Sequence, residues 1–202
     1  MYIIGITGGT ASGKTTFVNH LKTKFSSQEI NIISQDDYYK PLTHLSIKER
    51  EQTNFDHPKA IDFKLLHQHI NNLKSGTSIN VPSYCFTTHN RLADVKLVNP
   101  KKVLIIEGIL ILSQTEIKNT CDYTIFIDAP HEIRFNRRLE RDIKERGRTK
   151  ESILKQFHDH INPMHEAFVS PIKTSVNMII DGTKDLTLNV DKISELITKH
   201  LS

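Results

Sequence analysis

The chain has 202 residues, of which 37% are hydrophobic and 25% charged, and this composition predicts one globular domain over residues 1–202. The net charge of +4 at pH 7 comes from basic residues spread along the chain with one concentration at 134–148, so we expect no nucleic acid partner. Cys85 and Cys121 are isolated, and no apolar run reaches the ~20 residues that span a membrane, so we expect a cytoplasmic protein with reduced thiols and no membrane contact.

Short β-rich segments alternate with helical patterns along the chain, which predicts an α/β fold with a parallel sheet flanked by helices. The predicted strands lie at residues 2–6, 30–34, 103–107, 123–128 and 177–181. The predicted helices lie at 14–25, 62–74, 131–145, 150–160 and 191–201, with Gly76 and Gly147 where two of them end. Two extended segments, 79–84 and 93–98, flank a polar turn at 87–91 and predict a β-hairpin inserted before the third core strand.

The carboxyl ends of four predicted core strands carry chemically distinctive residues, namely Gly8, Asp36, Glu107 and Asp128. Open α/β sheets bind ligands at this edge. A glycine loop and three carboxylates at one edge therefore indicate a functional site. The alternative is that the acids are ordinary solvated loop residues.

Residues 8–15 read G-G-T-A-S-G-K-T and match the phosphate-binding pattern G-x-x-x-x-G-K-[ST], directly between a predicted strand and a predicted helix. The glycines let backbone N–H groups point at a phosphate, and the helix N-terminus adds a partial positive charge. Lys14 is expected to bridge the β- and γ-phosphate oxygens, and the Thr15 hydroxyl to ligate Mg²⁺. A structural Gly-rich turn is the alternative. The predicted nucleotide-binding residues are Gly8, Gly9, Thr10, Ala11, Ser12, Gly13, Lys14, Thr15 and Thr16.

Three further polar segments follow, Q-D-D-Y-Y-K at 35–40, N-F-D-H-P at 54–58 and P-S-Y-C-F-T-T-H-N-R at 82–91. With the glycine loop, I-E-G-I-L at 106–110 and R-G-R at 146–148, the chain resembles the uridine kinase family of P-loop kinases over most of its length. Phosphoribulokinase and bacterial pantothenate kinase are similar in fold. The N-F-D-H-P block and the P-x-Y…H-x-R hairpin look like the pyrimidine nucleoside branch.

The resemblance implies a P-loop NTPase-type sheet, with the hairpin insertion at about 79–98 projecting toward the acceptor and a helical lid at about 131–160. It implies transfer of the γ-phosphoryl group of ATP or GTP, assisted by Mg²⁺, to the 5′-hydroxyl of uridine or cytidine. The products would be UMP or CMP, formed in cytoplasmic pyrimidine salvage. The resemblance also implies a homotetramer.

A carboxylate that accepts the proton of the attacking hydroxyl is expected after the second strand, where spacing alone leaves Asp36 and Asp37 open. The resemblance favours Asp36, because the family's base occupies the first position of a D-S-[FY]-Y pattern in which Asp37 replaces the serine. Glu107 resembles a Walker-B-like acid that holds Mg²⁺ directly or through water. A hydrogen-bonded buried carboxylate is the alternative for Glu107.

The resemblance further implies a set of nucleoside-binding residues. Asp56 would accept hydrogen bonds from the ribose hydroxyls, Tyr84 and His89 would read the base, and Phe86 would stack on it. Cys85 stands where the family usually has an aspartate. The implied set is Tyr39, Phe55, Asp56, Tyr84, Phe86, His89, Arg138, Arg148 and Gln156.

An arginine-rich segment lies at 131–148, with acidic residues interspersed. Some of its arginines are expected in a solvated helix with i,i+4 pairs such as Arg138 with Asp142. The planar guanidinium also suits phosphate oxygens, and a helical lid would keep water from the γ-phosphate. By resemblance, Arg141 and Arg146 reach the triphosphate and act in catalysis with Lys14 and Asp36, whereas Arg138, Arg148 and Gln156 face the nucleoside.

Two other functional classes fit parts of the sequence. A P-loop kinase for another small alcohol, such as pantothenate or a sugar phosphate, would differ only in its acceptor. A nucleotide-dependent switch or an RNA-binding NTPase is supported by the basic charge alone, and the chain has no N-K-x-D guanine-reading motif. The pairs His67 with His69 and His158 with His160 lie two apart on predicted helices and do not share a face, so no zinc site is expected.

Overall fold

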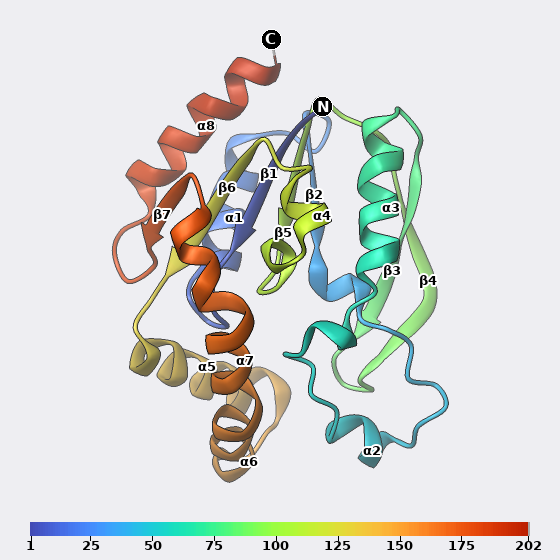
Figure 1. Ribbon diagram of the computed structural model, residues 1–202, viewed down its shortest axis with the longest axis vertical. Coiled ribbons are helices and arrows are strands. Elements are labelled where there is room, and N and C mark those ends of the chain that lie inside the picture. Colours follow the sequence, from blue (N-terminus) through green and yellow to red (C-terminus); the bar gives the residue numbers. More distant parts are fainter. Residues whose placement is uncertain (202) are drawn as a thin grey trace.

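A five-stranded parallel sheet forms the centre of the computed structural model, which describes residues 1–201 (Figure 1). Its strand order is β2-β5-β1-β6-β7, and all four neighbouring pairs are parallel. The predicted α/β fold is therefore confirmed, and every predicted strand is present to within one residue at each end. The strands are β1 (Tyr2–Thr7), β2 (Ile30–Ser34), β5 (Val103–Glu107), β6 (Tyr123–Asp128) and β7 (Met178–Asp181).

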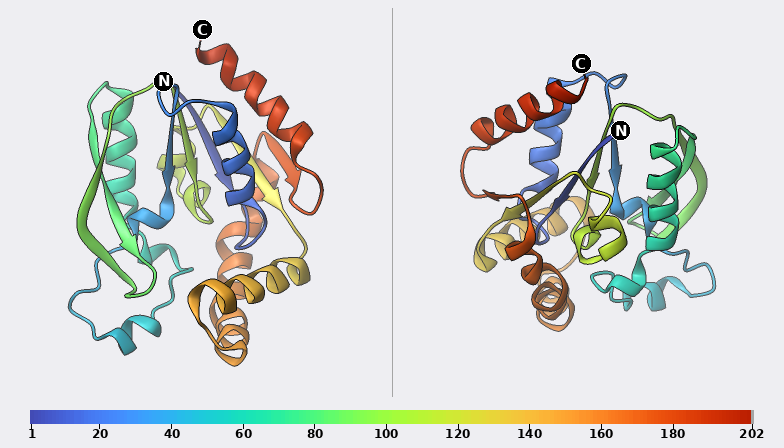
Figure 2. Two further views of the ribbon diagram at one scale, coloured as in Figure 1. Left: turned by 180° about the vertical axis from the view of Figure 1, so that it is seen from behind. Right: turned by 45° about the horizontal axis from the view of Figure 1, so that its top comes forward.

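The strands are mostly apolar because both faces of the sheet are covered. Successive side chains point to opposite faces, so Ile3 packs in one buried cluster and Ile4 in the other. Helices α1 (Lys14–Lys24) and α8 (Thr187–Leu201) cover one face, where they lie against each other (Figure 2). No helix among residues 1–201 is long and apolar enough to cross a bilayer.

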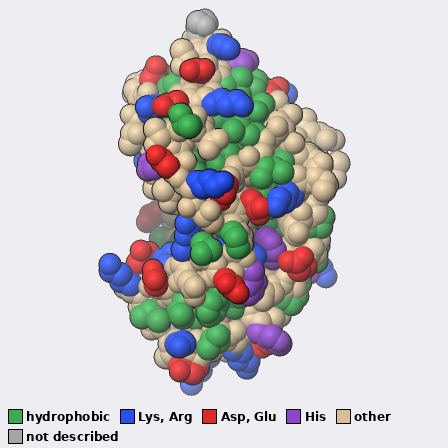
Figure 3. All heavy atoms as spheres, turned by 90° about the vertical axis from the view of Figure 1, so that its left-hand side faces the viewer, with side chains coloured by type: hydrophobic (Ala, Val, Ile, Leu, Met, Phe, Trp, Pro, Cys, Tyr) green, Lys and Arg blue, Asp and Glu red, His purple; other side chains and the backbone are tan. Residues whose placement is uncertain are grey.

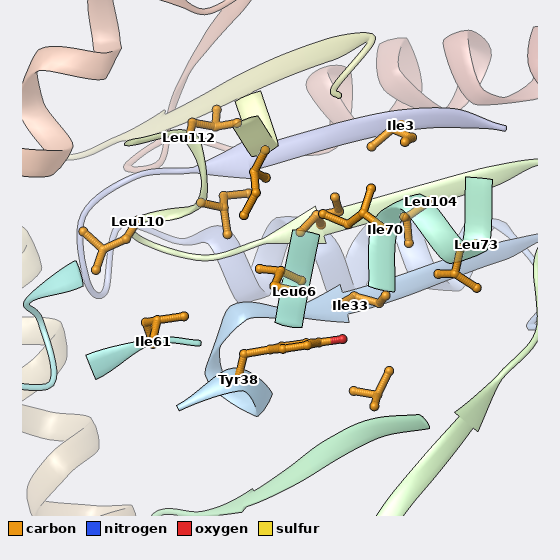
Figure 4. Close-up of a cluster of buried hydrophobic side chains, with 14 of the residues drawn as sticks. Ile3, Ile33, Tyr38, Ile61, Leu66, Ile70, Leu73, Leu104, Leu110 and Leu112 are labelled. Carbon is orange, nitrogen blue, oxygen red and sulfur yellow. The ribbon is translucent and has the colours of Figure 1, made fainter. Parts of the chain in front are cut away.

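The other face is covered by α3 (Phe63–Lys74), by α4 (Thr115–Lys118) and by a short 3₁₀ helix at Ile111–Ser113. Leu66, Ile70 and Leu73 recur at helical spacing on α3 and pack toward the buried strand side chains Ile33 and Leu104 (Figure 4). This amphipathic stripe explains why the segment forms a surface helix.

The predicted hairpin is present as a separate two-stranded antiparallel sheet of β3 (Ile79–Cys85) and β4 (Asn90–Val98). It is inserted between α3 and β5, as the sequence indicated. The turn occupies residues 86–89, so the predicted turn at 87–91 was placed too late in the sequence. Asn90 already pairs with Cys85, and Arg91 with Tyr84. The left-handed backbone of His89 (φ +48°) ends the turn.

Helical segments surround the carboxyl ends of the strands, at the lower edge of Figure 1. On one side lie α5 (His131–Arg146), α6 (Lys150–Gln156) and α7 (Asn162–Met164), and on the other α2 (Ile47–Glu51) with the hairpin turn. Gly147, in the left-handed conformation (φ +62°), ends α5 as predicted. Further short helical turns are Gln35–Tyr38, Pro58–Ala60, Phe157–Ile161, His165–Val169 and Ser170–Ser175.

Two predicted helices differ from the observed ones. The helix expected at 150–160 leaves the α-helical pattern after Gln156 and continues as a wide π-helical turn at Phe157–Ile161. Pro163 follows, and it lacks the N–H that the α-helical ladder would need. The helix expected at 191–201 begins at Thr187, because Asp185 accepts hydrogen bonds from the Thr187 N–H (2.9 Å) and hydroxyl (2.7 Å) and starts the helix earlier.

Candidate active site

The phosphate-binding loop folds as its glycine spacing predicts. Gly8 (φ +145°), Ala11 (φ +57°) and Gly13 (φ +109°) have positive backbone angles, which let the chain curl between β1 and α1. The ammonium group of the buried Lys14 lies inside the curl, where Nζ donates to the carbonyl oxygens of Gly8 (2.9 Å) and Gly9 (2.8 Å). The loop therefore holds its lysine in place before any phosphate binds.

Three ionisable groups share the carboxyl edge of the sheet. Burial lowers the pKa of Lys14 to about 8, although Glu107 and Asp36 oppose the shift. Burial also raises the pKa of Asp36 and of Glu107, and the Asp36 charge raises that of Glu107 further. The Ser34 hydroxyl donates to Glu107 Oε1 at 2.5 Å. These carboxylates are thus desolvated and close to each other, with Lys14 as a nearby cation.

Asp36 is positioned by a 3₁₀ helix at Gln35–Tyr38, which directly follows β2. The Ser34 side chain accepts from the Asp36 N–H (3.3 Å) and starts this turn. Its far end is fixed by Arg91 of β4, which donates to the carbonyl oxygens of Tyr38 (3.2 Å) and Tyr39 (2.9 Å). Asp37, the rival for the base, has its pKa raised to about 6 by burial and by the neighbouring Asp36 charge.

One cavity, partly open to solvent, brings most of the candidate residues together. Its wall contains Asp36, Arg141, Arg146 and all nine residues of the implied nucleoside-binding set. Among the described residues of the glycine loop it includes Thr10, whereas Lys14, Thr15, Thr16 and Glu107 lie outside it. The wall also contains Ile109, which was not predicted as a site residue. The full wall is Thr10, Asp36, Tyr39, Phe55, Asp56, Tyr84, Phe86, His89, Ile109, Arg138, Arg141, Arg146, Arg148 and Gln156.

Aromatic rings form one end of the cavity. Tyr39 and Tyr84 lie with ring centroids 4.7 Å apart, and Phe55 stacks on His89 at 5.3 Å with an interplanar angle of 20°. Phe86 meets the edge of Tyr84 at 5.2 Å. Burial, followed by the charge of Arg148, lowers the pKa of His89, so its imidazole is neutral near pH 7. This end offers flat apolar surfaces together with a hydroxyl and a neutral imidazole.

Arginines from α5 and the loop after it form the other end. The Arg138 guanidinium donates to Thr10 Oγ1 (2.8 Å) and to Gln156 Oε1 (3.1 Å), and Arg148 donates to the same oxygen of Gln156 (2.6 Å). The Arg146 guanidinium lies over the Phe86 ring, 4.8 Å from its centroid. The arginine end is therefore linked both to the phosphate loop and to the aromatic end.

The predicted pair of Arg138 with Asp142 exists, but the expectation of a solvated pair was wrong. Their side chains are 8% and 0% exposed, with 3.3 Å between Arg138 Nε and Asp142 Oδ2. Asp128 ends β6 at the carboxyl edge, as predicted, but it does not line the cavity and forms an ion pair with Lys173. Arg138 and Asp142 are buried because α5 faces the cavity with its arginines.

Three contributors were missed from the sequence. Ile109 lines the cavity, although it stands in the I-E-G-I-L segment that carried the resemblance. The sequence analysis treated Asp142 as one acid among several. The pattern that could have identified it is that arginines stand four residues before, one before and four after it. Arg134 is 3% exposed and lies against Gly9 of the phosphate loop, a contact that no local pattern reveals.

Comparison with known proteins identifies the family of the chain. The model of the Phosphoribulokinase / Uridine kinase family matches residues 3–188. A uridine kinase of Clostridium perfringens is 43% identical over 201 residues, which cover 98% of this chain and 97% of that protein. A uridine kinase of Aliivibrio salmonicida is 38% identical over 203 residues, covering 98% and 94%.

Among solved structures, the D-glycerate 3-kinase from Cryptococcus neoformans var. grubii is similar, with a TM-score of 0.65 over 91% of this chain and 87% of that one. At 18% identity this likeness concerns the fold alone. The family model and the relatives, in contrast, extend over nearly the whole sequence. The chain belongs to the Phosphoribulokinase / Uridine kinase family and is a kinase.

Proposed function

We propose that this protein transfers the γ-phosphoryl group of ATP or GTP to the 5′-hydroxyl of uridine or cytidine, giving UMP or CMP in cytoplasmic pyrimidine salvage. The observation that carries the assignment is the cavity with aromatic rings at one end and Asp36 with arginines at the other. A pyrimidine needs flat apolar surfaces, whereas pantothenate and sugar phosphates contain no aromatic ring. The aromatic end therefore favours a nucleoside over the other small alcohols.

The donor side of the reaction is assigned to the glycine loop and the arginine end. The backbone N–H groups of residues 8–16 and the N-terminus of α1 would hold the phosphates, with Lys14 at the β- and γ-oxygens. Arg141 and Arg146 would approach the transferring phosphoryl group and stabilise its developing charge. Asp36 would take the proton of the 5′-hydroxyl, and its raised pKa makes it a better proton acceptor than an exposed aspartate.

Magnesium fits the residues at the carboxyl edge. Asp36 and Glu107 are desolvated carboxylates, and the repulsion from Asp36 raises the pKa of Glu107. A divalent cation beside them would favour their charged forms. Thr15, exposed at the start of α1, would supply a hydroxyl and Glu107 a carboxylate, directly or through water. When bound, Mg²⁺ neutralises charge on the β- and γ-phosphates.

The acceptor side is assigned to the aromatic end and its neighbours. Asp56 is 7% exposed in the cavity wall and would accept hydrogen bonds from the ribose hydroxyls. Tyr84 and His89 would face the edge of the base, where each can donate or accept. Tyr39, Phe55 and Phe86 would pack on the flat faces, and Arg138, Arg148 and Gln156 would complete the nucleoside pocket.

A coupled assay with the purified protein tests this function. ATP and GTP are offered with uridine, cytidine, deoxyuridine, thymidine, adenosine, pantothenate and ribulose 5-phosphate, with and without EDTA. Phosphorylation of uridine and cytidine above all other acceptors, abolished by EDTA and restored by excess Mg²⁺, is expected. Preference for pantothenate or a sugar phosphate, or nucleotide hydrolysis stimulated by RNA, would overturn the assignment.

The RNA-binding alternative lacks a continuous basic surface on the face shown in Figure 3. Lys and Arg side chains alternate there with Asp and Glu side chains. A nucleic acid track needs a stripe of positive charge. We also propose a homotetramer, which rests on the family resemblance, and light scattering of the purified protein would give its mass directly.

A further inference from the structure

Asp142 lies at the centre of the arginine end, with its side chain 0% exposed. Its carboxylate contacts four guanidinium groups, which come from positions 138, 141, 146 and 148. Burial opposes ionisation of Asp142, but the surrounding arginines outweigh it and hold the pKa of this carboxyl below its ordinary value. Asp142 is therefore a buried anion whose charge depends on the pocket arginines.

The two carboxylate oxygens divide these arginines. Oδ1 accepts two hydrogen bonds from Arg141, from Nε at 2.9 Å and Nη2 at 2.8 Å, and lies 3.6 Å from Arg146 Nε. Oδ2 lies 3.3 Å from Arg138 Nε and 3.8 Å from Arg148 Nη1. Oδ1 thus faces the two arginines assigned to the triphosphate and is hydrogen-bonded to Arg141, whereas Oδ2 faces the two assigned to the nucleoside at ion-pair distances without a hydrogen bond.

We propose, on the basis of the kinase function proposed above, that Asp142 is a positioning residue that orients the four pocket arginines and connects the phosphate side with the nucleoside side. Four guanidinium groups so close together repel one another, and the central carboxylate offsets that repulsion. Phosphoryl transfer depends on positioning of such charges. The carboxylate is too deeply buried, and too fully surrounded by arginines, to act on a substrate itself.

The alternative is that Asp142 merely stabilises the end of α5. The backbone argues against this, because the N–H groups of Gly147 and Arg148 bond to the Asp142 carbonyl oxygen, not to its side chain. The helix end is therefore closed by main-chain bonds that any residue at position 142 can make. Asp142→Asn keeps those bonds and the side-chain volume while removing the negative charge.

The experiment compares the wild type with Asp142→Asn and with Glu140→Gln, which removes an exposed carboxylate from the same helix. Arginine Nε–H signals are recorded by ¹⁵N NMR, ATP affinity by calorimetry, and kcat with uridine. In Asp142→Asn we expect the Arg141 Nε–H signal to shift and exchange faster with water, and kcat to fall about 10²-fold. ATP affinity should not weaken, because all four positive charges remain. Glu140→Gln should resemble the wild type in all three measurements.

Three outcomes would overturn the inference. These are unchanged arginine signals in Asp142→Asn, an unchanged kcat, or a loss of kcat and ATP affinity together with a lowered melting temperature. If Asp142→Asn does not fold, the NMR spectrum of the wild type still tests the inference. Rapid exchange of the Arg141 Nε–H with water would contradict its hydrogen bond to Oδ1. The NMR readout needs no nucleoside, so failure of the wild type to phosphorylate uridine would refute the proposed function separately.

Discussion

Replacing Gly9 of the phosphate loop by alanine is predicted to be unfavourable because Arg134 occupies the space that a side chain would need, and not because of backbone freedom. A Cβ at this position would lie 2.8 Å from Arg134 Nη1, 2.9 Å from its Cδ and 3.0 Å from its Cζ. All three distances are below the 3.4 Å at which ordinary contact begins. Arg134 cannot simply move aside, because its side chain is 3% exposed and Nε donates to the Ala129 carbonyl oxygen (3.2 Å).

Gly9→Ala should therefore destabilise the fold by about 1–3 kcal/mol, the usual cost of overpacking a buried site. Removing the obstructing side chain should relieve the clash, so Gly9→Ala in an Arg134→Ala background should cost much less. We expect a coupling energy of about 1–3 kcal/mol between the two positions. Urea unfolding of the wild type, both single variants and the double variant measures each term.

The matched control is Arg137→Ala on the same helix, since the Arg137 guanidinium contacts the Gly182 carbonyl oxygen and not Gly9. Gly9→Ala and Arg137→Ala should be additive within about 0.5 kcal/mol. A neutral Gly9→Ala, or additivity of Gly9→Ala with Arg134→Ala, would refute the idea that Arg134 is what requires glycine here.

Four further outcomes follow from the site. Lys14→Ala should lower kcat at least about 10²-fold in the uridine assay, because a cation is lost where charge develops, and near-normal turnover would remove it from the mechanism. Asp36→Asn should also cut kcat at least ~10²-fold with ATP affinity retained by calorimetry, whereas Asp37→Asn should be mild; the reverse ranking would make Asp37 the base. The pKa of Asp37 is raised to about 6 in the folded state. Ionisation of this carboxyl therefore lowers the free energy of unfolding as the pH rises from about 3.9 to about 6. Asp37→Asn should thus stabilise the fold above pH 6 but not below pH 4, as thermal melts at both values would test. Asp56→Asn should lose at least ~2 kcal/mol of the preference of kcat/KM for uridine over deoxyuridine, and full retention of that preference would contradict its role at the ribose.

Local patterns predicted the central sheet well, because burial on both faces demands apolar β-rich runs with turn residues at their ends. The glycine loop was equally readable, since its conformation depends on glycines at set positions within one short segment. Element ends were less predictable. The start of α8 depends on a side-chain bond from Asp185, and the π-helical turn after Gln156 depends on where the ladder meets Pro163.

The family resemblance named nine nucleoside-binding residues, and the fold brings all of them into one cavity wall. Their segments are far apart in sequence, at 39, 55–56, 84–89 and 138–156. No spacing rule relates these segments to one another. The aromatic end exists because the hairpin packs against the 3₁₀ helix at Gln35–Tyr38, where Arg91 donates to the carbonyl oxygens of Tyr38 and Tyr39.

The sequence alone determined the fold class, the phosphate loop and the family, because each depends on residues whose relation along the chain is local or patterned. Only the tertiary structure decided that Arg134 packs against Gly9 and that Asp142 is buried among four arginines of the cavity wall. Gly9 lies outside α5, so no helical spacing relates it to Arg134, whereas three of the arginines around Asp142 stand on α5 itself and only their burial was not specified by the spacing. Whether a charged side chain on α5 faces solvent or the interior depends on what packs against the helix, and long-range folding alone supplies that neighbour.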